Sequence, residues 1–126
     1  MTNISSKAEI TSAIFNSMNS RNFSGIEPFM ADNMEFDFPG AGCISGKKRV
    51  LIFLNALLRK YPELVFSVSE ILIDGQHACA VWSNKGKDIN DNPYENRGMT
   101  YIRFENEKIV FLSDYFKDTT FTKAKT

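Results

Sequence analysis

The sequence has little cysteine and histidine, the residues on which disulfide frameworks and structural zinc sites depend. Cys43 and Cys79 lie far apart with no CxxC pair, and His77 is the single histidine. Neither a disulfide scaffold nor a zinc site is expected, and no cofactor is predicted. The polar stretch Asp88–Asn92 lacks the spacing and terminal Glu of an EF-hand, which predicts a plain turn.

Net charge and long apolar runs are also missing. Lys and Arg number 15, as do Asp and Glu, so the net charge is zero and no nucleic-acid partner is indicated. No stretch approaches the roughly 18 apolar residues of a membrane span. The N-terminal MTNISSKAEI lacks the basic start and apolar run of a secretory signal. We expect a cytoplasmic protein with reduced thiols and no membrane partner.

Phenylalanine, in contrast, is abundant, with 11 among 126 residues. This content, within 43% hydrophobic residues, excludes disorder and favours a bulky core, a lined cavity or a buried interface. The length fits a single domain over residues 1–126, with a core at about 7–119 and a tail at 120–126.

Helices are predicted in the first part of the chain. Ser6 and Glu9 form a capping-box pattern before apolar residues at helical spacing, which predicts a helix ending near Arg21. Ser24 is a candidate cap for a second, shorter helix, because Pro28 is tolerated in a first turn.

Strands dominate the rest of the chain. Residues Met34–Pro39 alternate in the strand manner, and the loop PGAGCISG breaks regular structure. Ser45 is a candidate cap for a third helix, which Tyr61-Pro62 ends. The segments after it read as strands: Leu64–Ile73, His77–Lys85, Tyr94–Phe104 and Ile109–Lys117. This order predicts an α+β domain with a curved antiparallel sheet over helices.

The last strand is apolar on both faces, which a sheet with one solvated face should not be. One face carries Ile109, Phe111 and Tyr115, and the other carries Val110, Leu112 and Phe116. We expect the helices to cover one face and a second copy of the chain to cover the other, giving a homodimer through the sheet. The alternative is a monomer with a large exposed apolar patch.

Two longer motifs, MADNMEFDFPG and IRFENEKIVFLSDYF, resemble the SnoaL-like polyketide-cyclase family of the nuclear transport factor 2-like superfamily. The resemblance extends from about Lys7 to Thr119. It implies a cone-shaped, cystatin-like α+β barrel whose mouth admits a small hydrophobic ligand, usually in a dimer.

The resemblance also places family positions on residues of this chain. In the ketosteroid isomerases, the position of the general-base Asp falls here at Phe38. The position of their oxyanion-holding Tyr falls at Ile14, and that of their protonated Asp falls near Thr100. This chain therefore lacks their catalytic residues. The Arg and first Asp of the limonene epoxide hydrolases fall near Asn84 and Gly86, which do not match either. Steroid isomerisation and epoxide hydrolysis by those residue sets are therefore not predicted.

Asp114 is the candidate catalytic residue. Strand alternation places it on the face of Leu112 and Phe116, and the resemblance gives it the role of the cyclases' acid/base Asp. Apolar surroundings raise a carboxyl's pKa, so that it can move a proton next to a carbonyl or activate water. Asn84 is a candidate donor to an incipient enolate. The side chains expected to line the cavity are Ile14, Met18, Phe36, Phe38, Phe53, Trp82, Thr100, Ile102, Phe104, Leu112 and Phe116.

Other interpretations stay open. Asp114 can equally be a structural acceptor for Arg97, Arg103, Tyr94 or Tyr101, and an ionic partner would lower its pKa rather than raise it. The protein would then be a non-catalytic ligand-binding or dimerisation module using the same cavity. A protein-binding adaptor would instead need an exposed apolar groove outside the dimer face.

Overall fold

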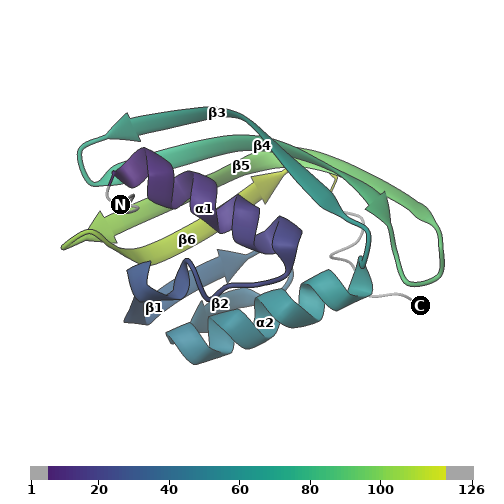
Figure 1. Ribbon diagram of the computed structural model, residues 1–126, viewed down its shortest axis with the longest axis horizontal. Coiled ribbons are helices and arrows are strands. Elements are labelled where there is room, and N and C mark those ends of the chain that lie inside the picture. Colours follow the sequence, from purple (N-terminus) through teal and green to yellow (C-terminus); the bar gives the residue numbers. More distant parts are fainter. Residues whose placement is uncertain (1–5, 119–126) are drawn as a thin grey trace.

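The computed structural model describes residues 6–118, in which two helices lie on one face of a twisted six-stranded sheet (Figure 1). The elements are α1 (Lys7–Ser20), η1 (Glu27–Phe29), β1 (Met30–Phe38), β2 (Gly42–Ser45), α2 (Lys47–Lys60), β3 (Val65–Asp74), β4 (His77–Lys87), β5 (Pro93–Glu105) and β6 (Lys108–Phe116). The predicted α+β fold is confirmed. The tail predicted at 120–126 lies outside the described residues.

The sheet has the strand order β2-β1-β6-β5-β4-β3. It is mixed rather than wholly antiparallel, because β1 and β6 run parallel while the other neighbours are antiparallel. It is also open, with β2 and β3 as its edges. Strands β3 to β6 form a meander. Strand β1, the first strand in the chain, lies beside β6, the last one.

Helix α1 begins and ends as the sequence predicts. Ser6 Oγ accepts from the Glu9 amide at 3.0 Å, and Glu9 Oε1 accepts from the Ser6 amide at 3.2 Å, which completes the capping box. Arg21 closes the helix in the left-handed conformation. The Asn19 side chain then bonds both backbone groups of Phe66 on the edge strand β3, at 2.9 and 2.8 Å. These bonds fix α1 across the sheet.

The second predicted helix is only a single 3-10 turn. Its N-cap is Ile26, without a side-chain cap bond, so the predicted Ser24 cap is wrong. Buried Phe23 and Ile26 anchor this segment to the core, and the extended strand β1 begins directly after the turn at Met30. Too few residues separate Ile26 from the start of β1 at Met30 for a longer helix.

The glycine-rich loop contains a strand that the sequence did not predict. Gly40 and Gly42 have positive φ, which lets the chain reverse and pair β2 with β1 as a hairpin. Ser45 lies in β2, where its hydroxyl donates to Glu35 Oε2 at 3.2 Å. It therefore does not cap α2, whose N-cap is Gly46.

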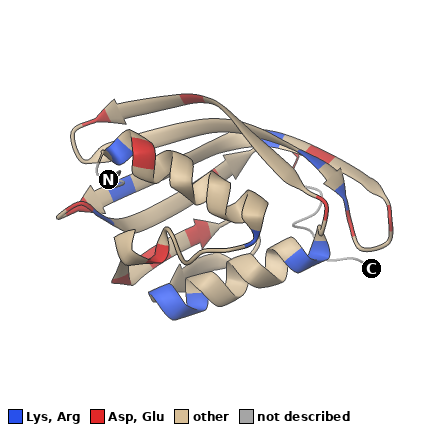
Figure 2. Ribbon diagram, viewed as in Figure 1, with Lys and Arg blue, Asp and Glu red and all other residues tan. Residues whose placement is uncertain are grey.

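The core lies between the helices and the inner face of the sheet. Its fully buried apolar side chains include Ile10, Met34, Val50, Ile102, Phe104 and Ile109. Charged residues gather at element ends and at the β4–β5 hairpin, while the middle of both helices is uncharged (Figure 2). Within residues 6–118, neither helix has the length and apolar content needed to cross a membrane.

The outer face of the sheet carries exposed apolar side chains among charged ones such as Arg97 and Arg103. Ile109, which was expected on this face, is instead fully buried, because a β-bulge pairs it with the inward-facing Phe104. Tyr115 is 62% exposed, Leu72 52% and Met99 42%, and Phe111 and Tyr101 lie beside them on the same face. His77 is exposed at the start of β4, and Cys79 lies on the face of that strand opposite Trp82.

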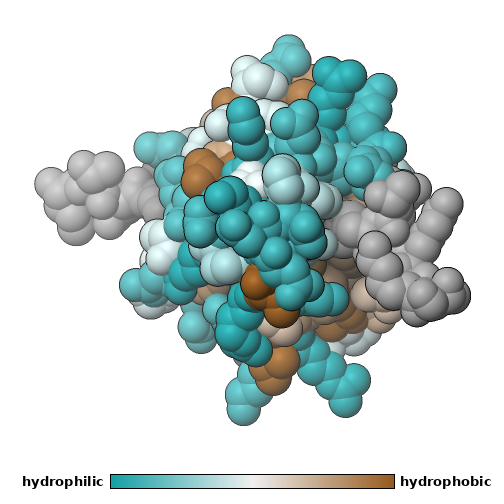
Figure 3. Space-filling view, turned by 90° about the vertical axis from the view of Figure 1, so that its right-hand side faces the viewer, coloured by the Kyte–Doolittle hydropathy of each residue, from teal (hydrophilic) through white to brown (hydrophobic). Residues whose placement is uncertain are grey.

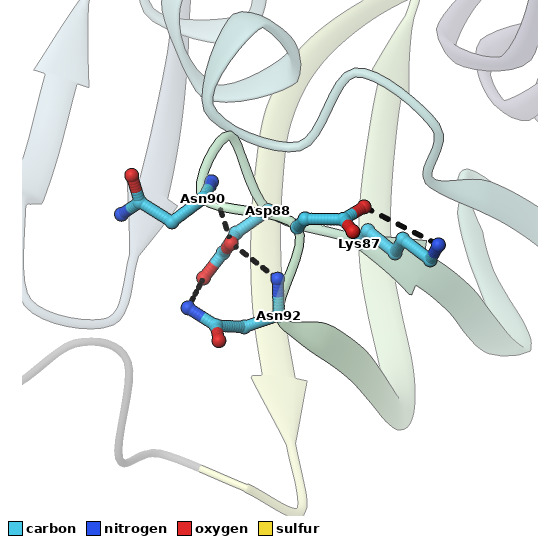
Figure 4. A network of polar contacts seen from close by, with 5 residues as sticks. Lys87, Asp88, Asn90 and Asn92 are labelled. Carbon is cyan, nitrogen blue, oxygen red and sulfur yellow. Dashed lines mark hydrogen bonds and ion pairs between the residues drawn. The ribbon is translucent and has the colours of Figure 1, made fainter.

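The β4–β5 connection is a turn held by one carboxylate (Figure 4). Asp88 Oδ1 accepts from the amides of Asn90 and Asn92 at 2.9 and 3.0 Å, and Lys87 forms an ion pair with Asp91 at 3.2 Å. The Asp88 oxygens are thus engaged by the turn itself. Among the described residues there is no cluster of three His, Cys, Asp or Glu side chains that suits a metal ion.

Candidate functional site

A cavity lies between the helices and the inner face of the sheet. Its volume is about 50 Å³, which is room for a few water molecules, so aromatic side chains fill most of this interior. The lining residues are Ile14, Phe15, Met18, Phe36, Phe38, Leu54, Leu57, Tyr61, Leu64, Phe66, Trp82, Asn84, Tyr94, Asn96, Thr100, Leu112, Asp114 and Phe116.

One side of the cavity is open to solvent. Five lining residues keep part of their surface exposed, namely Leu57, Tyr61, Tyr94, Asp114 and Phe116, while the others are buried. The exposed group joins the end of α2 to β5 and β6. The cavity therefore meets solvent between these elements.

Asp114 lies on β6 directly opposite Thr100 on β5. The Thr100 hydroxyl donates to Asp114 Oδ1 at 2.6 Å, and Trp82 Nε1 donates to the same hydroxyl oxygen at 2.9 Å. This chain of bonds fixes one carboxylate oxygen, and the second oxygen has no hydrogen-bond partner among residues 6–118. The carboxyl group is therefore oriented and still has a free oxygen at the cavity wall.

Burial raises the pKa of Asp114 from 3.8 to about 7, and the hydrogen bond from Thr100 opposes this rise. The two effects have a plain physical origin. Apolar walls penalise the carboxylate, while a donor at 2.6 Å favours it. The residue keeps some exposed surface, so Asp114 lies in the wall beside the opening rather than on a sealed floor. Near neutral pH both protonation states are populated.

An ion pair for Asp114, the structural alternative, is not found among the described residues. Arg97, Tyr101 and Arg103 alternate with Thr100 along β5 and project from the outer face. Tyr94 lines the cavity, but its hydroxyl accepts from Asn96 Nδ2 at 3.0 Å. Burial raises the pKa of Tyr94 to about 12, so this hydroxyl stays protonated.

Most of the predicted cavity residues line the cavity: Ile14, Met18, Phe36, Phe38, Trp82, Thr100, Leu112 and Phe116. Phe53 lies behind the wall, where its ring contacts Phe38 with centroids 4.9 Å apart. Ile102 and Phe104 do not line it either. They share the inward face of β5 with Thr100, but they lie farther along the strand, where the core is solid and both are fully buried.

Several lining residues were not predicted from the sequence. Tyr94 and Asn96 share strand parity with Thr100, so the alternation of β5 carried a signal for both. Tyr61 stacks against Tyr94 with centroids 4.7 Å apart, across two segments far apart in the chain. No local pattern in the sequence marks that contact.

Asn84 lines the cavity on β4, four residues beyond Ala80, which pairs with Thr100. Thr100 pairs in turn with Asp114, so Asn84 lies two strands and four residue positions from that carboxyl group. Its predicted role as a donor to an enolate formed beside Asp114 remains a prediction.

Hydrophilic residues cover most of the surface seen in Figure 3, which views the molecule from the end with the β4–β5 hairpin and the end of α2. The hydrophobic residues visible there form small separate areas.

Comparisons with known proteins agree with this fold. The family model of the SnoaL-like domain matches residues 12–112. No curated protein matches the chain.

Solved structures similar to this one include a nuclear transport factor 2-like protein of unknown function from Burkholderia pseudomallei. Its TM-score is 0.80 and its identity 18%, over 93% of this chain and 92% of that one. A protein described as a SnoaL-like polyketide cyclase from a Jannaschia species has a TM-score of 0.78 and 11% identity, over 87% and 84% of the two chains. A protein with a ketosteroid isomerase-like fold from Catenulispora acidiphila, solved with trimethylamine, has a TM-score of 0.80 and 14% identity, over 91% and 90%. Identities this low show a shared fold.

Proposed function

Because the chain belongs to the SnoaL-like domain family, we propose that it binds a small hydrophobic molecule in the cavity and that Asp114 moves a proton on it. The observation that carries the proposal is the setting of Asp114. One of its oxygens is fixed by Thr100 at 2.6 Å and the other is free at the cavity wall. A group with a pKa of about 7 gives and takes protons with similar ease at neutral pH.

The reaction class follows from this chemistry. As a carboxylate, Asp114 removes a hydrogen from a carbon next to a ligand carbonyl, and as a carboxylic acid it returns the proton to another atom. This is the proton transfer of an isomerase or a cyclase, and a hydrolase would use the same carboxylate to activate water. The step needs no cofactor. Thr100 keeps the reactive carboxyl in one rotamer throughout.

A non-catalytic module of the same fold is the second candidate, and one observation favours it. The free volume is only about 50 Å³, so the aromatic side chains fill most of the interior. Leu57, Tyr61 and Phe116 must turn outward before a ligand of two rings can enter. Partial exposure of these three side chains supports such a movement.

We also propose that the outer face of the sheet pairs with a second copy of the chain. Exposed Leu72, Met99 and Tyr115 lie on the same face as Tyr101 and Phe111, on strands β3, β5 and β6. Several large apolar side chains exposed together on one sheet face are typical of a contact surface. A cytoplasmic location is part of the proposal, and the free thiols of Cys43 and Cys79 are consistent with it.

The catalytic proposal is tested with β-tetralone, a small bicyclic ketone with acidic hydrogens next to its carbonyl. Proton NMR in deuterated buffer measures the exchange of these hydrogens. Trp82 is the single tryptophan and lines the cavity, so its fluorescence measures binding separately. The matched control is Asp37→Asn, which makes the same chemical change at an exposed position of β1.

We expect exchange above the buffer rate in the wild type and in Asp37→Asn. Asp114→Asn should slow the exchange about 100-fold or more, as loss of a general base does, while the ketone still binds. Equal exchange rates in Asp114→Asn and the wild type would remove Asp114 as the base. Binding without any exchange in the wild type would favour the non-catalytic module.

A further inference from the structure

Asn84, which lines the cavity, has an unpaired buried side-chain oxygen. The residue is 8% exposed, and its Oδ1 is fully buried without a hydrogen-bond partner among residues 6–118. Its side-chain amide donates to no group in the same part of the chain. Buried polar atoms are nearly always paired, so an unpaired acceptor in a cavity wall indicates a partner that comes from outside the chain.

Asn96 shows why no neighbour pairs with this oxygen. It lies directly opposite Asn84 on β5, but its own side chain is fully used. Its Nδ2 donates to the Tyr94 hydroxyl at 3.0 Å and to the Asp118 carbonyl at 2.9 Å, and its Oδ1 accepts from the Asp118 amide at 2.9 Å. The Asn96 side chain is thus fully hydrogen-bonded within the protein, whereas the Asn84 side chain facing it keeps an unpaired oxygen.

The strand register places Asn84 and Asp114 at opposite ends of one path through the cavity. Asn84 pairs with Asn96, and two residues along, Trp82 pairs with Gly98. Two residues further, Thr100 pairs with Asp114. A strand rises about 3.3 Å per residue, so the two polar positions lie about 13 Å apart along the strands.

The middle of this path is aromatic. Trp82 and Phe116 flank Gly98, and their ring centroids are 6.4 Å apart. A Cβ atom added to Gly98 would collide with the Tyr115 carbonyl and the Phe116 side chain, so no side chain separates the two rings there. The path therefore runs from an acceptor, past two aromatic rings, to a carboxyl group.

We propose that Asn84 Oδ1 determines ligand specificity by accepting a hydrogen bond from a hydroxyl or N–H group of the ligand. The ligand class is an elongated, flat, apolar molecule with this donor at one end and a carbonyl at the other. The carbonyl end meets Asp114, and this part of the inference rests on the proposed function. The Asn84 end rests on the unpaired oxygen alone.

Three ketones test the inference: β-tetralone, its derivative with a hydroxyl on the ring far from the carbonyl, and the methyl ether of that derivative. The hydroxyl donates to Asn84 Oδ1, whereas the ether presents a second acceptor to it. Trp82 fluorescence gives the dissociation constants. We expect the hydroxyl compound to bind the wild type about tenfold or more tightly than the other two.

Asn84→Leu removes the acceptor and keeps the side-chain size, and we expect it to abolish the preference for the hydroxyl compound. Because it also removes an unpaired buried polar group, its melting temperature should not fall. The matched control, Ser83→Ala, changes the neighbouring exposed residue of β4 and should keep the preference. A preference for the ether, equal binding of all three ketones, or no binding of any would overturn the inference.

The two proposals fail in different ways. A hydroxyl preference without exchange at the carbonyl end would support the role of Asn84 and remove the catalytic role of Asp114. Exchange that depends on Asp114, without any preference for the hydroxyl compound, would support the catalytic role of Asp114 and remove the role of Asn84. A hydroxyl preference that survives Asn84→Leu would assign the recognition to another residue and overturn the inference.

Discussion

The inner and outer faces of strands β4, β5 and β6 are both rich in aromatic side chains. The polar groups among these rings are exposed to solvent on the outer face and enclosed on the inner face. On the outer face, His77 bonds the Tyr101 hydroxyl at 2.6 Å, and the Arg103 guanidinium lies 5.3 Å from the centre of the Phe111 ring. These groups meet solvent. On the inner face the same kind of ring encloses Asp114, and burial raises its pKa to about 7.

The difference shows that position on the sheet, and not composition, decides what a polar residue does here. Alternate residues of one strand project to opposite faces. Thr100 bonds the buried carboxyl, and its neighbour Tyr101 bonds the exposed histidine. A substitution on one face should therefore leave the other face unchanged, and the following predictions use this separation.

The largest effect is expected on the inner face at Gly98. Gly98→Ala places a methyl group against the Tyr115 carbonyl and the Phe116 side chain, so the backbone of β5 or β6 must shift. We expect the free energy of unfolding to fall by about 2–3 kcal/mol in a urea titration. Gly25→Ala is the control, because an added Cβ there meets nothing within 4 Å. Equal, small losses in both variants would contradict the tight row of Trp82, Gly98 and Phe116.

The next effect concerns pH. The folded-state pKa of Asp114 is raised from 3.8 to about 7, so its ionisation removes stability as the pH rises through this range. The full rise corresponds to at most roughly 4 kcal/mol. Solvent at the partly exposed residue reduces this, so we expect about 2 kcal/mol.

Asp114→Asn cannot ionise, so it should gain about 2 kcal/mol of unfolding free energy relative to the wild type between pH 4 and pH 8. Urea titrations at the two pH values measure this gain. A constant difference between variant and wild type would mean that the carboxyl is solvated. Asp37→Asn controls for the same substitution on the exposed face.

A smaller effect is expected on the outer face at Tyr115, which is 62% exposed. If a second copy covers this face, Tyr115→Lys should weaken the dimer about tenfold, because it places a charge in an apolar contact. Light scattering after size-exclusion chromatography at several concentrations measures the dimer. Ile52→Lys, at a 67% exposed position of α2, should leave it unchanged. A wild-type monomer at all concentrations would refute the proposed pairing.

The smallest effect is expected from Thr100→Val. The hydroxyl bond lowers the pKa of Asp114, so its removal should raise that pKa further, by about one pH unit. The pH dependence of ketone exchange should shift upward by the same amount. Ser113→Ala, which removes a hydroxyl that donates to Asp37 on the other face, should not move it. A downward shift would contradict the sign of the Thr100 contribution.

Much of the fold could be predicted from the sequence because its signals are local. The capping box of α1 and the alternation in the last strand each depend on residues close together in the chain. The strand β2 was missed because its glycines, which usually interrupt strands, serve here to turn a hairpin. The parallel pairing of β1 with β6 joins distant segments, and no local pattern encodes it.

The candidate site could be predicted only in part, for a related reason. The alternation of side chains along a strand identifies the face on which Asp114 lies. It does not show which residues of that face line the cavity and which lie in the solid core. Ile102 and Phe104 were therefore placed in the cavity, although they lie in the solid core. The partner of Asp114 proved to be Thr100, which depends on strand register rather than on any motif.

The central claim is that apolar walls hold the Asp114 carboxyl near the point of half-protonation at neutral pH. A carbon-13 NMR titration of the aspartate carboxyl signals, assigned by comparison with Asp114→Asn, measures this most directly. We predict a midpoint for Asp114 at about pH 7. A midpoint at its ordinary value of 3.8 would show a solvated carboxylate and contradict both the enclosed setting and the proposed proton transfer.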